Sequence, residues 1–253
     1  MIGAILGDII GSRFGGKGND NKEFKLFTPK STITDNTVIT CAVAEALMSK
    51  GENETLPEAV VRTMHEIGQE YPDCGYSGYL KTWILEGKTE PYNSFGDNSA
   101  MRISPVAFAY DDYDEMMDAA TAVSEVTHNH WEGIKGAQAA ADVIWMARHK
   151  VPFEIMRKKV TERYYRDEIH NTEEMYGTCM LSVPSAILAF LDSESFEDAV
   201  RRAVVMGVGS RAVPCMAGAM AEAYFGVPEK LQKQAMTYLD DRLTDIVTRF
   251  EER

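Results

Sequence analysis

Asp8, Asp35 and Asp97 are the candidate acid and base groups of this sequence, and Arg211 is the candidate group that stabilises charge. A positioned carboxyl can give or take a proton in a transition state, and a fixed guanidinium stabilises negative charge there. This combination is typical of a site that breaks a bond by acid/base catalysis. We assign catalytic roles to Asp35 and Asp97, and a ligand contact to Asp8.

The glycine-rich run at residues 207–212 indicates a second kind of chemistry. Its spacing matches a dinucleotide-binding fingerprint, which requires a strand before it and a helix after it. Residues 196–203, which precede it, have helical character, so we reject the dinucleotide site. A helix that begins near Arg211 would still favour an anion, through the guanidinium and the free amides of Gly209, Ser210 and Arg211. We therefore predict a phosphate or carboxylate ligand there.

His128 and His130 flank Asn129, and Trp131 follows directly. Either histidine could contact a ligand, or could instead be satisfied by the backbone at a helix end. An exposed Trp131 could stack on a base or sugar, although we expect it to pack against the protein.

The elements that must position these residues are helices. Apolar residues three or four apart between Leu231 and Phe250 predict one continuous helix. Thr55 opens a capping box, and Pro152 and Ser195 stand where helices should begin. No segment shows sustained apolar/polar alternation, so we predict an all-α fold. Residues 11–34 and 86–97 lack periodicity, and loops of such length usually serve a site.

Composition limits the classes of function. The net charge of -13 and the pI near 4.9 argue against a nucleic-acid partner, which would need a basic face. No apolar stretch approaches the roughly 20 residues of a membrane span, and the first residues do not form a signal peptide. Four widely spaced cysteines indicate reduced thiols rather than zinc or disulfides. We expect a cytoplasmic protein with one domain over residues 1–253.

Five segments in order resemble the ADP-ribosylglycohydrolase family, and together they span nearly the whole chain. They are residues 3–14, 34–38, 94–106, 127–138 and 207–226. The resemblance implies an orthogonal helical bundle that binds ADP-ribose in a cleft. It also implies paired Mg²⁺ ions, held by Thr-Asp-Asp early in the chain and Asp-x-Asp-Thr late, which help to cleave the bond at the anomeric carbon. Such oxygen-rich ligands suit Mg²⁺.

The ligand-binding residues that we predict combine the resemblance with the anion site. They are Asp8, Thr34, Asn36, Gly96, Asn98, Ser99, Met101, Arg102, His128, His130, Gly209, Ser210 and Arg211.

The sequence departs from the family pattern at the expected metal ligands. Asn36 replaces a carboxylate, and Gly209, Arg211 and Ala212 replace the late Asp, Asp and Thr. Gly15 stands where an acidic residue commonly helps to position the attacking water. Thr34 and Asp35 remain as candidates for a metal, but we expect magnesium binding to be weak or absent. Random drift would also explain such changes, yet they concentrate at the metal site while its flanking helices still match.

Three hypotheses follow. The first is a protein that binds ADP-ribose, a related nucleotide or an ADP-ribosylated macromolecule, with weak or absent hydrolysis. The second is a hydrolase of an ADP-ribosyl or related bond that works without the metal pair, with Asp35, Asp97 or Asp8 as acid or base and Arg211 stabilising charge. The third is a regulatory or structural protein that uses only the scaffold. The sequence leaves the oligomeric state open.

Overall fold

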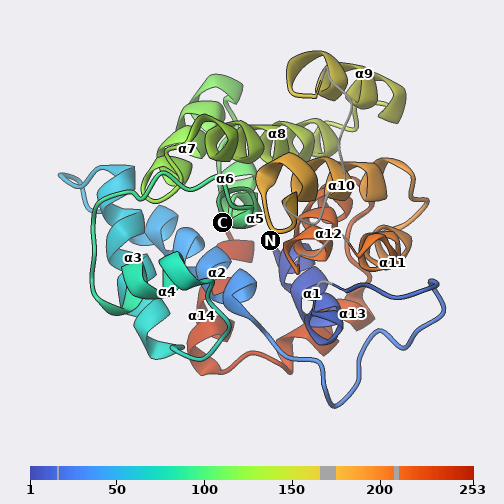
Figure 1. Cartoon of the computed structure of the whole chain (residues 1–253), viewed down its shortest axis with the longest axis horizontal. Helices are drawn as coiled ribbons and strands as arrows, with labels where there is room; N and C mark the ends of the chain where they lie inside the picture. Colours follow the sequence, from blue (N-terminus) through green and yellow to red (C-terminus); the bar gives the residue numbers. More distant parts are fainter. Residues whose placement is uncertain (16, 166–174, 208–210) are drawn as a thin grey trace.

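The computed structural model describes residues 1–15, 17–165, 175–207 and 211–253, and this part of the chain is helical (Figure 1). It contains no β-strand within those ranges, and Gly96 pairs with Thr178 in a single isolated bridge. The prediction of an all-α fold is confirmed. The elements in order are α1 (Ile2–Gly11), the 3-10 turn η1 (Ser12–Phe14), α2 (Asp35–Ser49), α3 (Leu56–Glu70), α4 (Gly78–Leu85), α5 (Asn98–Met101), α6 (Ser104–Ala109), α7 (Tyr113–Glu125), α8 (Trp131–Arg148), α9 (Phe153–Arg163), α10 (Cys179–Leu191), α11 (Phe196–Met206), α12 (Ala212–Phe225), α13 (Glu229–Met236) and α14 (Asp241–Glu251).

Helices α1 and α12 form the centre of the bundle, where every residue of α1 is buried. They approach closely because glycines line the contact. A Cβ on Gly3 would lie 2.4 Å from the carbonyl oxygen of Gly218, and a Cβ on Gly7 would lie 2.0 Å from that of Pro214. Only glycine permits such contact between backbones. The contact brings Asp8 of α1 towards the first turn of α12.

The other helices pack around this pair. Helix α2 packs on α3 and α14, while α8 packs on α7, α10 and α12. Figure 1 shows α3 and α4 on one side of the centre, and α7, α8 and α10 along another. Helices α2, α5 and α12 start in this arrangement with their first residues close to one another.

Local sequence signals placed the starts of three helices, α3, α9 and α11. Thr55 and Glu58 form the predicted capping box, in which each backbone amide donates to the side chain of the other residue. Ser195 accepts a hydrogen bond from the Asp198 amide, and Pro152 precedes α9. Helix α11 precedes the glycine-rich run where a dinucleotide site would need a strand, so the rejection of that site is confirmed.

The predicted helix from Leu231 to Phe250 is wrong, because the chain breaks into α13 and α14 between Met236 and Asp241. Asp240 causes the break: its side chain caps α14 by accepting from the Leu243 amide at 3.0 Å, and it also accepts from the Tyr71 hydroxyl at 2.7 Å. The apolar spacing continues across the break because both helices lie against the same core.

The two predicted loops are confirmed outside η1. No helix forms between Phe14 and Asp35 in the described residues, and the chain between α4 and α5 is irregular. Among the described helices, none has the length and apolar character needed to cross a bilayer. The four cysteines form no disulfide, and Cys74 is half-buried whereas the other three are buried.

Candidate functional site

A pocket of about 280 Å³ lies where α2, α5 and α12 begin. Asp35 and Asn36 are the first residues of α2, Asn98 is the first of α5, and Ala212 is the first of α12. The complete described lining is Asp35, Asn36, Gly75, Ser77, Tyr79, Tyr92, Ser94, Gly96, Asp97, Asn98, His128, Gly177, Arg211 and Ala212. Several helix N-termini therefore present their positive ends to one cavity.

Asp8 lies behind this lining and is fully buried. Its carboxylate accepts hydrogen bonds from the hydroxyls of Thr34 and Thr37, both at 2.6 Å, and from their backbone amides. The Asn36 side chain donates to it as well, at 3.1 Å. Burial raises the pKa of Asp8, and these hydrogen bonds oppose that rise. Asp8 thus ties the start of α2 to α1, and its carboxylate faces protein donors.

Asp35 and Arg211 form an ion pair inside the pocket. A terminal guanidinium nitrogen of Arg211 lies 3.4 Å from an Asp35 oxygen and donates to the Gly75 carbonyl at 3.0 Å. Gly75 has a φ of +105°, and a Cβ there would lie 3.0 Å from both terminal nitrogens of Arg211. Glycine at this position therefore leaves room for the guanidinium beside the carboxylate.

Asp35 is electrostatically perturbed. Burial raises its pKa to about 7, the Arg211 guanidinium lowers it, and the nearby carboxylates of Asp8 and Asp97 raise it further. A carboxyl group with such a pKa exchanges its proton near neutral pH, which suits a general acid or base.

The side-chain oxygens described at this site do not fit a pair of magnesium ions. The Thr34 hydroxyl donates to Asp8 and accepts from the Asn36 amide, and the Asn36 side-chain nitrogen also points to Asp8. The Asp35 carboxylate already pairs with the Arg211 guanidinium. The Ala212 side chain has no oxygen that could ligate a metal. Within the described ranges, no cluster of three or more His, Cys, Asp or Glu side chains could hold a metal ion. Magnesium requires several oxygen ligands in octahedral array.

The segment that includes α5 divides into two groups of residues. Gly96, Asp97 and Asn98 line the pocket. The other predicted residues are buried and lie outside the pocket lining. The Ser99 hydroxyl donates to the Gly133 carbonyl at 2.9 Å, and Met101 accepts from the Thr40 hydroxyl.

Arg102 is also fully buried, and its guanidinium donates to Asn98, to Thr127 and to the carbonyls of Val123 and Ser124. Desolvation lowers its pKa to about 10, so it remains a cation near neutral pH. It satisfies carbonyls at the end of α7 and supports Asn98 from behind the pocket wall.

The two predicted histidines lie in different places. His128 lines the pocket with 2% of its surface exposed, and its Nδ1 lies 2.7 Å from the Thr127 hydroxyl. Burial and the nearby Arg102 hold the pKa of His128 well below its usual value, so its ring is neutral. His130 lies outside the lining and caps α8, where its Nδ1 accepts from the Glu132 amide at 3.2 Å.

Trp131 is 64% exposed, so the expectation that it packs against the protein is wrong. Its ring instead lies 4.7 Å from the Lys135 ammonium, a cation–π contact that extra exposure to solvent weakens.

Several lining residues carried no signal in the sequence. Tyr79 is highly exposed and stacks on Tyr92 with ring centroids 5.9 Å apart. Gly75 and Ser77 precede α4, in a stretch that contains no recognisable motif. For Tyr92, the sequence predicted only that it lies in the loop at 86–97. Of the predicted residues, Gly209 and Ser210 lie outside the described residues.

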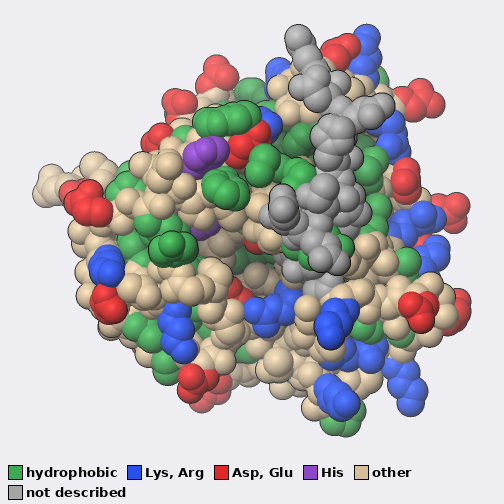
Figure 2. All heavy atoms as spheres, viewed as in Figure 1, with side chains coloured by type: hydrophobic (Ala, Val, Ile, Leu, Met, Phe, Trp, Pro, Cys, Tyr) green, Lys and Arg blue, Asp and Glu red, His purple; other side chains and the backbone are tan. Residues whose placement is uncertain are grey.

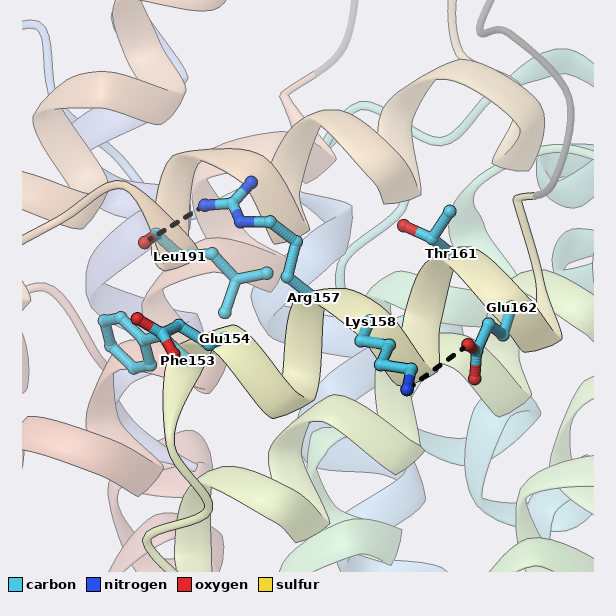
Figure 3. A pocket seen from close by; sticks show the side chains of 7 residues that line it. All are labelled: Phe153, Glu154, Arg157, Lys158, Thr161, Glu162 and Leu191. Atoms are coloured by element: carbon cyan, nitrogen blue, oxygen red, sulfur yellow. Dashed lines mark hydrogen bonds and ion pairs between the residues drawn. The ribbon is translucent and has the colours of Figure 1, made fainter.

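A larger cavity of about 600 Å³ lies elsewhere, beside α9 (Figure 3). Its polar side chains do not converge on one point: Figure 3 shows Lys158 turned to Glu162, and Arg157 turned to the Leu191 carbonyl. All of these polar groups are exposed at the surface, and none is a motif residue. The pocket at α2, α5 and α12 therefore remains the candidate site.

Comparisons with known proteins agree on one family. The family model described as ADP-ribosylglycohydrolase matches residues 1–253. The human ADP-ribosylhydrolase ARH3 is 24% identical over 98% of this chain and 90% of that protein, and the mouse ADP-ribosylhydrolase ARH3 is 24% identical over 92% and 85%. A solved structure described as an ADP-ribosylglycohydrolase-related protein complex has the same fold, with a TM-score of 0.73 at 19% identity, covering 98% of this chain and 95% of that one.

The match covers every residue from the first to the last, and it includes the five segments that resemble the family in sequence. The chain belongs to the ADP-ribosylglycohydrolase family.

Proposed function

We propose that this protein binds ADP-ribose, or a related nucleotide or ADP-ribosylated macromolecule, without a dinuclear magnesium centre, and that it hydrolyses its ligand weakly or not at all. The observation that carries this proposal is the ion pair of Arg211 with Asp35 at the wall of the pocket. A guanidinium offers a planar set of donors that matches phosphate oxygens. It supplies a fixed positive charge at a position where the family pattern has a carboxylate.

The surroundings of Arg211 favour an anion. Arg211 is the one Lys or Arg in the described lining, and it immediately precedes the first turn of α12. Helix N-termini bind anions through free amides and the helix dipole. Figure 2 shows Lys and Arg side chains mixed with Asp and Glu on the side of α11, where Arg201 and Arg202 pair with Glu197 and Asp198. The positive charge that the pocket itself offers to a phosphate is therefore that of Arg211.

Calorimetry with ADP-ribose, with and without Mg²⁺, tests this proposal. We expect wild-type affinity to change less than about twofold on addition of Mg²⁺ or EDTA, whereas Arg211→Ala weakens binding about tenfold, because a charge-assisted hydrogen bond is lost. Arg202→Ala is a matched control: Arg202 is 34% exposed against 33% for Arg211, and it pairs with Asp198 on α11, outside the pocket.

Two results would contradict the proposal. The first is saturable Mg²⁺ binding that disappears in Asp35→Asn, because the ion would then occupy the site assigned to Arg211. The second is the absence of any thermal shift with ADP-ribose, NAD or AMP, which would favour a scaffold without a ligand. A ligand at 100-fold its Kd should add about 2.7 kcal/mol of stability.

A second candidate function is hydrolysis of an ADP-ribosyl or related bond without the metal pair. The pKa of about 7 at Asp35 favours it, because such a carboxyl can serve as acid or base at neutral pH. Release of ADP-ribose that persists in EDTA, follows one ionisation near pH 7 and is lost in both Asp35→Asn and Asp97→Asn would support this function.

A further inference from the structure

The most exposed large apolar side chain among the described residues lies at the candidate site. Tyr79 is 79% exposed, and it belongs to the lining of the pocket that contains Asp35 and Arg211. Single exposed aromatic rings are common on protein surfaces. A ring that lines a cavity, however, offers its face to whatever the cavity binds.

Tyr79 forms a parallel stack with Tyr92. Their ring centroids lie 5.9 Å apart, and the two planes differ by 23°. Tyr92 also makes an edge-to-face contact with the His128 ring, with centroids 5.7 Å apart at 61°. All three rings line the pocket. One face of Tyr79 is therefore covered by Tyr92, and its opposite face is open to solvent.

The backbone that carries each ring of the stack is fixed. Leu80 and Trp83 bury the inner face of α4, so Tyr79 lies on the outer face of this helix. The Tyr92 amide donates to the Thr127 carbonyl at 3.2 Å. A third ring that joined this stack would find its partner already in place, and little of its binding free energy would be lost in ordering the protein.

The volume of the pocket indicates that part of a nucleotide-sized ligand lies outside it. The cavity of about 280 Å³ is smaller than the roughly 300–1,000 Å³ of cavities that enclose a drug-sized ligand. Arg211, the favoured contact of a phosphate, donates to the Gly75 carbonyl. The backbones of Gly75 and Tyr79 lie within about 14 Å of each other, because four extended residues span no more. The remainder of a ligand anchored at Arg211 can therefore reach the open face of Tyr79.

We propose that the open face of Tyr79 is a subsite for the planar base of a nucleotide, so that the pocket binds nucleotides more tightly than phosphorylated sugars that lack a base. Every purine and pyrimidine has a π face, so stacking on an aromatic side chain needs no hydrogen bond to the base. The inference rests on the function proposed above and adds an orientation to it: the phosphate lies beside Arg211, and the base lies at the mouth of the pocket.

Calorimetry with AMP and ribose 5-phosphate, which differ by the adenine base, tests the proposal. We expect the wild type to bind AMP about tenfold more tightly than ribose 5-phosphate. Tyr79→Ala should weaken AMP binding about tenfold and leave ribose 5-phosphate within about twofold of wild type. Tyr79→Phe keeps the ring and should stay within about twofold for both ligands. Arg211→Ala should weaken both ligands by similar factors, because both carry the phosphate.

Trp131→Ala is a matched control. Trp131 is also a highly exposed aromatic residue, at 64%, but it lies outside the pocket lining, and its loss should change neither affinity by more than about twofold. Saturation-transfer NMR of AMP provides a second readout. We expect the base protons to receive more saturation than the ribose protons in the wild type, and this difference should disappear in Tyr79→Ala.

Ribose 5-phosphate that binds within about twofold of AMP would overturn the proposal, as would equal losses for both ligands in Tyr79→Ala. A Tyr79→Phe protein as weak as Tyr79→Ala would also overturn it, because the hydroxyl rather than the ring face would then make the contact. In these cases the anion site at Arg211 still stands. If AMP, ribose 5-phosphate and ADP-ribose all fail to bind, the proposed function fails together with this inference.

Discussion

The two walls of the pocket differ in how they hold charge. On the side of α2 and α12, Asp35 and Arg211 form a partly exposed ion pair whose carboxyl has a pKa of about 7. On the side of α5 and α8, Arg102 is buried among neutral acceptors, and His128 is neutral. The first wall can respond to pH and to an incoming anion. The second is a closed network, so its role is to hold geometry.

The largest expected effect separates the two arginines. Arg102→Met should lower the free energy of unfolding by about 3 kcal/mol. The substitution removes the buried hydrogen-bond donor of the Val123 and Ser124 carbonyls and of the Thr127 hydroxyl. Arg211→Met should cost less than about 1 kcal/mol, since its ion pair is partly exposed. Urea unfolding monitored by circular dichroism measures both. Equal losses would show that the walls do not differ in this way.

Asp35→Asn tests the responsive wall through pH. The folded pKa of Asp35 lies above its unfolded value of 3.8, so the wild type loses stability as pH rises from about 4 through about 7. The amide cannot ionise, and we expect Asp35→Asn to be more stable than wild type by roughly 2 kcal/mol at about pH 8, with little difference at about pH 4. Thermal melts across this range measure the gap. A gap that is constant with pH would exclude the raised pKa.

The smallest expected effect concerns Gly75, whose backbone contacts the Arg211 guanidinium. Gly75→Ala should reduce stability by about 1 kcal/mol more than Gly87→Ala, and it alone should weaken ADP-ribose binding, by about threefold. Both glycines have positive φ, but a Cβ on Gly87 meets nothing within 4 Å, whereas a Cβ on Gly75 meets the guanidinium. Melts and calorimetry on the two variants provide the comparison. Equal effects would mean that backbone strain alone acts at Gly75.

The sequence motifs predicted that residues from both walls belong to the site. They did not predict which of these side chains face the cavity. Asn98 and Arg102 belong to the same motif, yet Asn98 lines the cavity and Arg102 points into the core. Asn98 begins α5 and Arg102 follows its last residue, four positions on and on the same helix face. The Arg102 guanidinium reaches past Asn98 to the carbonyls of Val123 and Ser124, so it lies behind the pocket wall. His128 and His130 likewise differ because His130 caps α8, and a cap directs its ring to the backbone.

Residues outside the motifs could not be predicted to line the site. Gly75, Tyr79 and Tyr92 are distant in sequence from Arg211, and no spacing connects them. The break between α13 and α14 could not be predicted from the sequence for a similar reason. The apolar period continued across it, and the contact of Asp240 with Tyr71 depends on the fold.

The sequence by itself determined the helical class, the capped starts of α3 and α11, and the presence of Asn36, Arg211 and Ala212 at positions where the resemblance implies metal ligands. These features depend on local hydrogen bonds and residue identity, which the sequence states directly. Only the tertiary structure decided that Arg211 lies against Asp35 and Gly75, and that Thr127 connects Arg102 to His128. Those contacts join residues from separate helices and loops, and packing at the close crossing of α1 and α12 fixes the distance between the helices that carry Asp8 and Arg211.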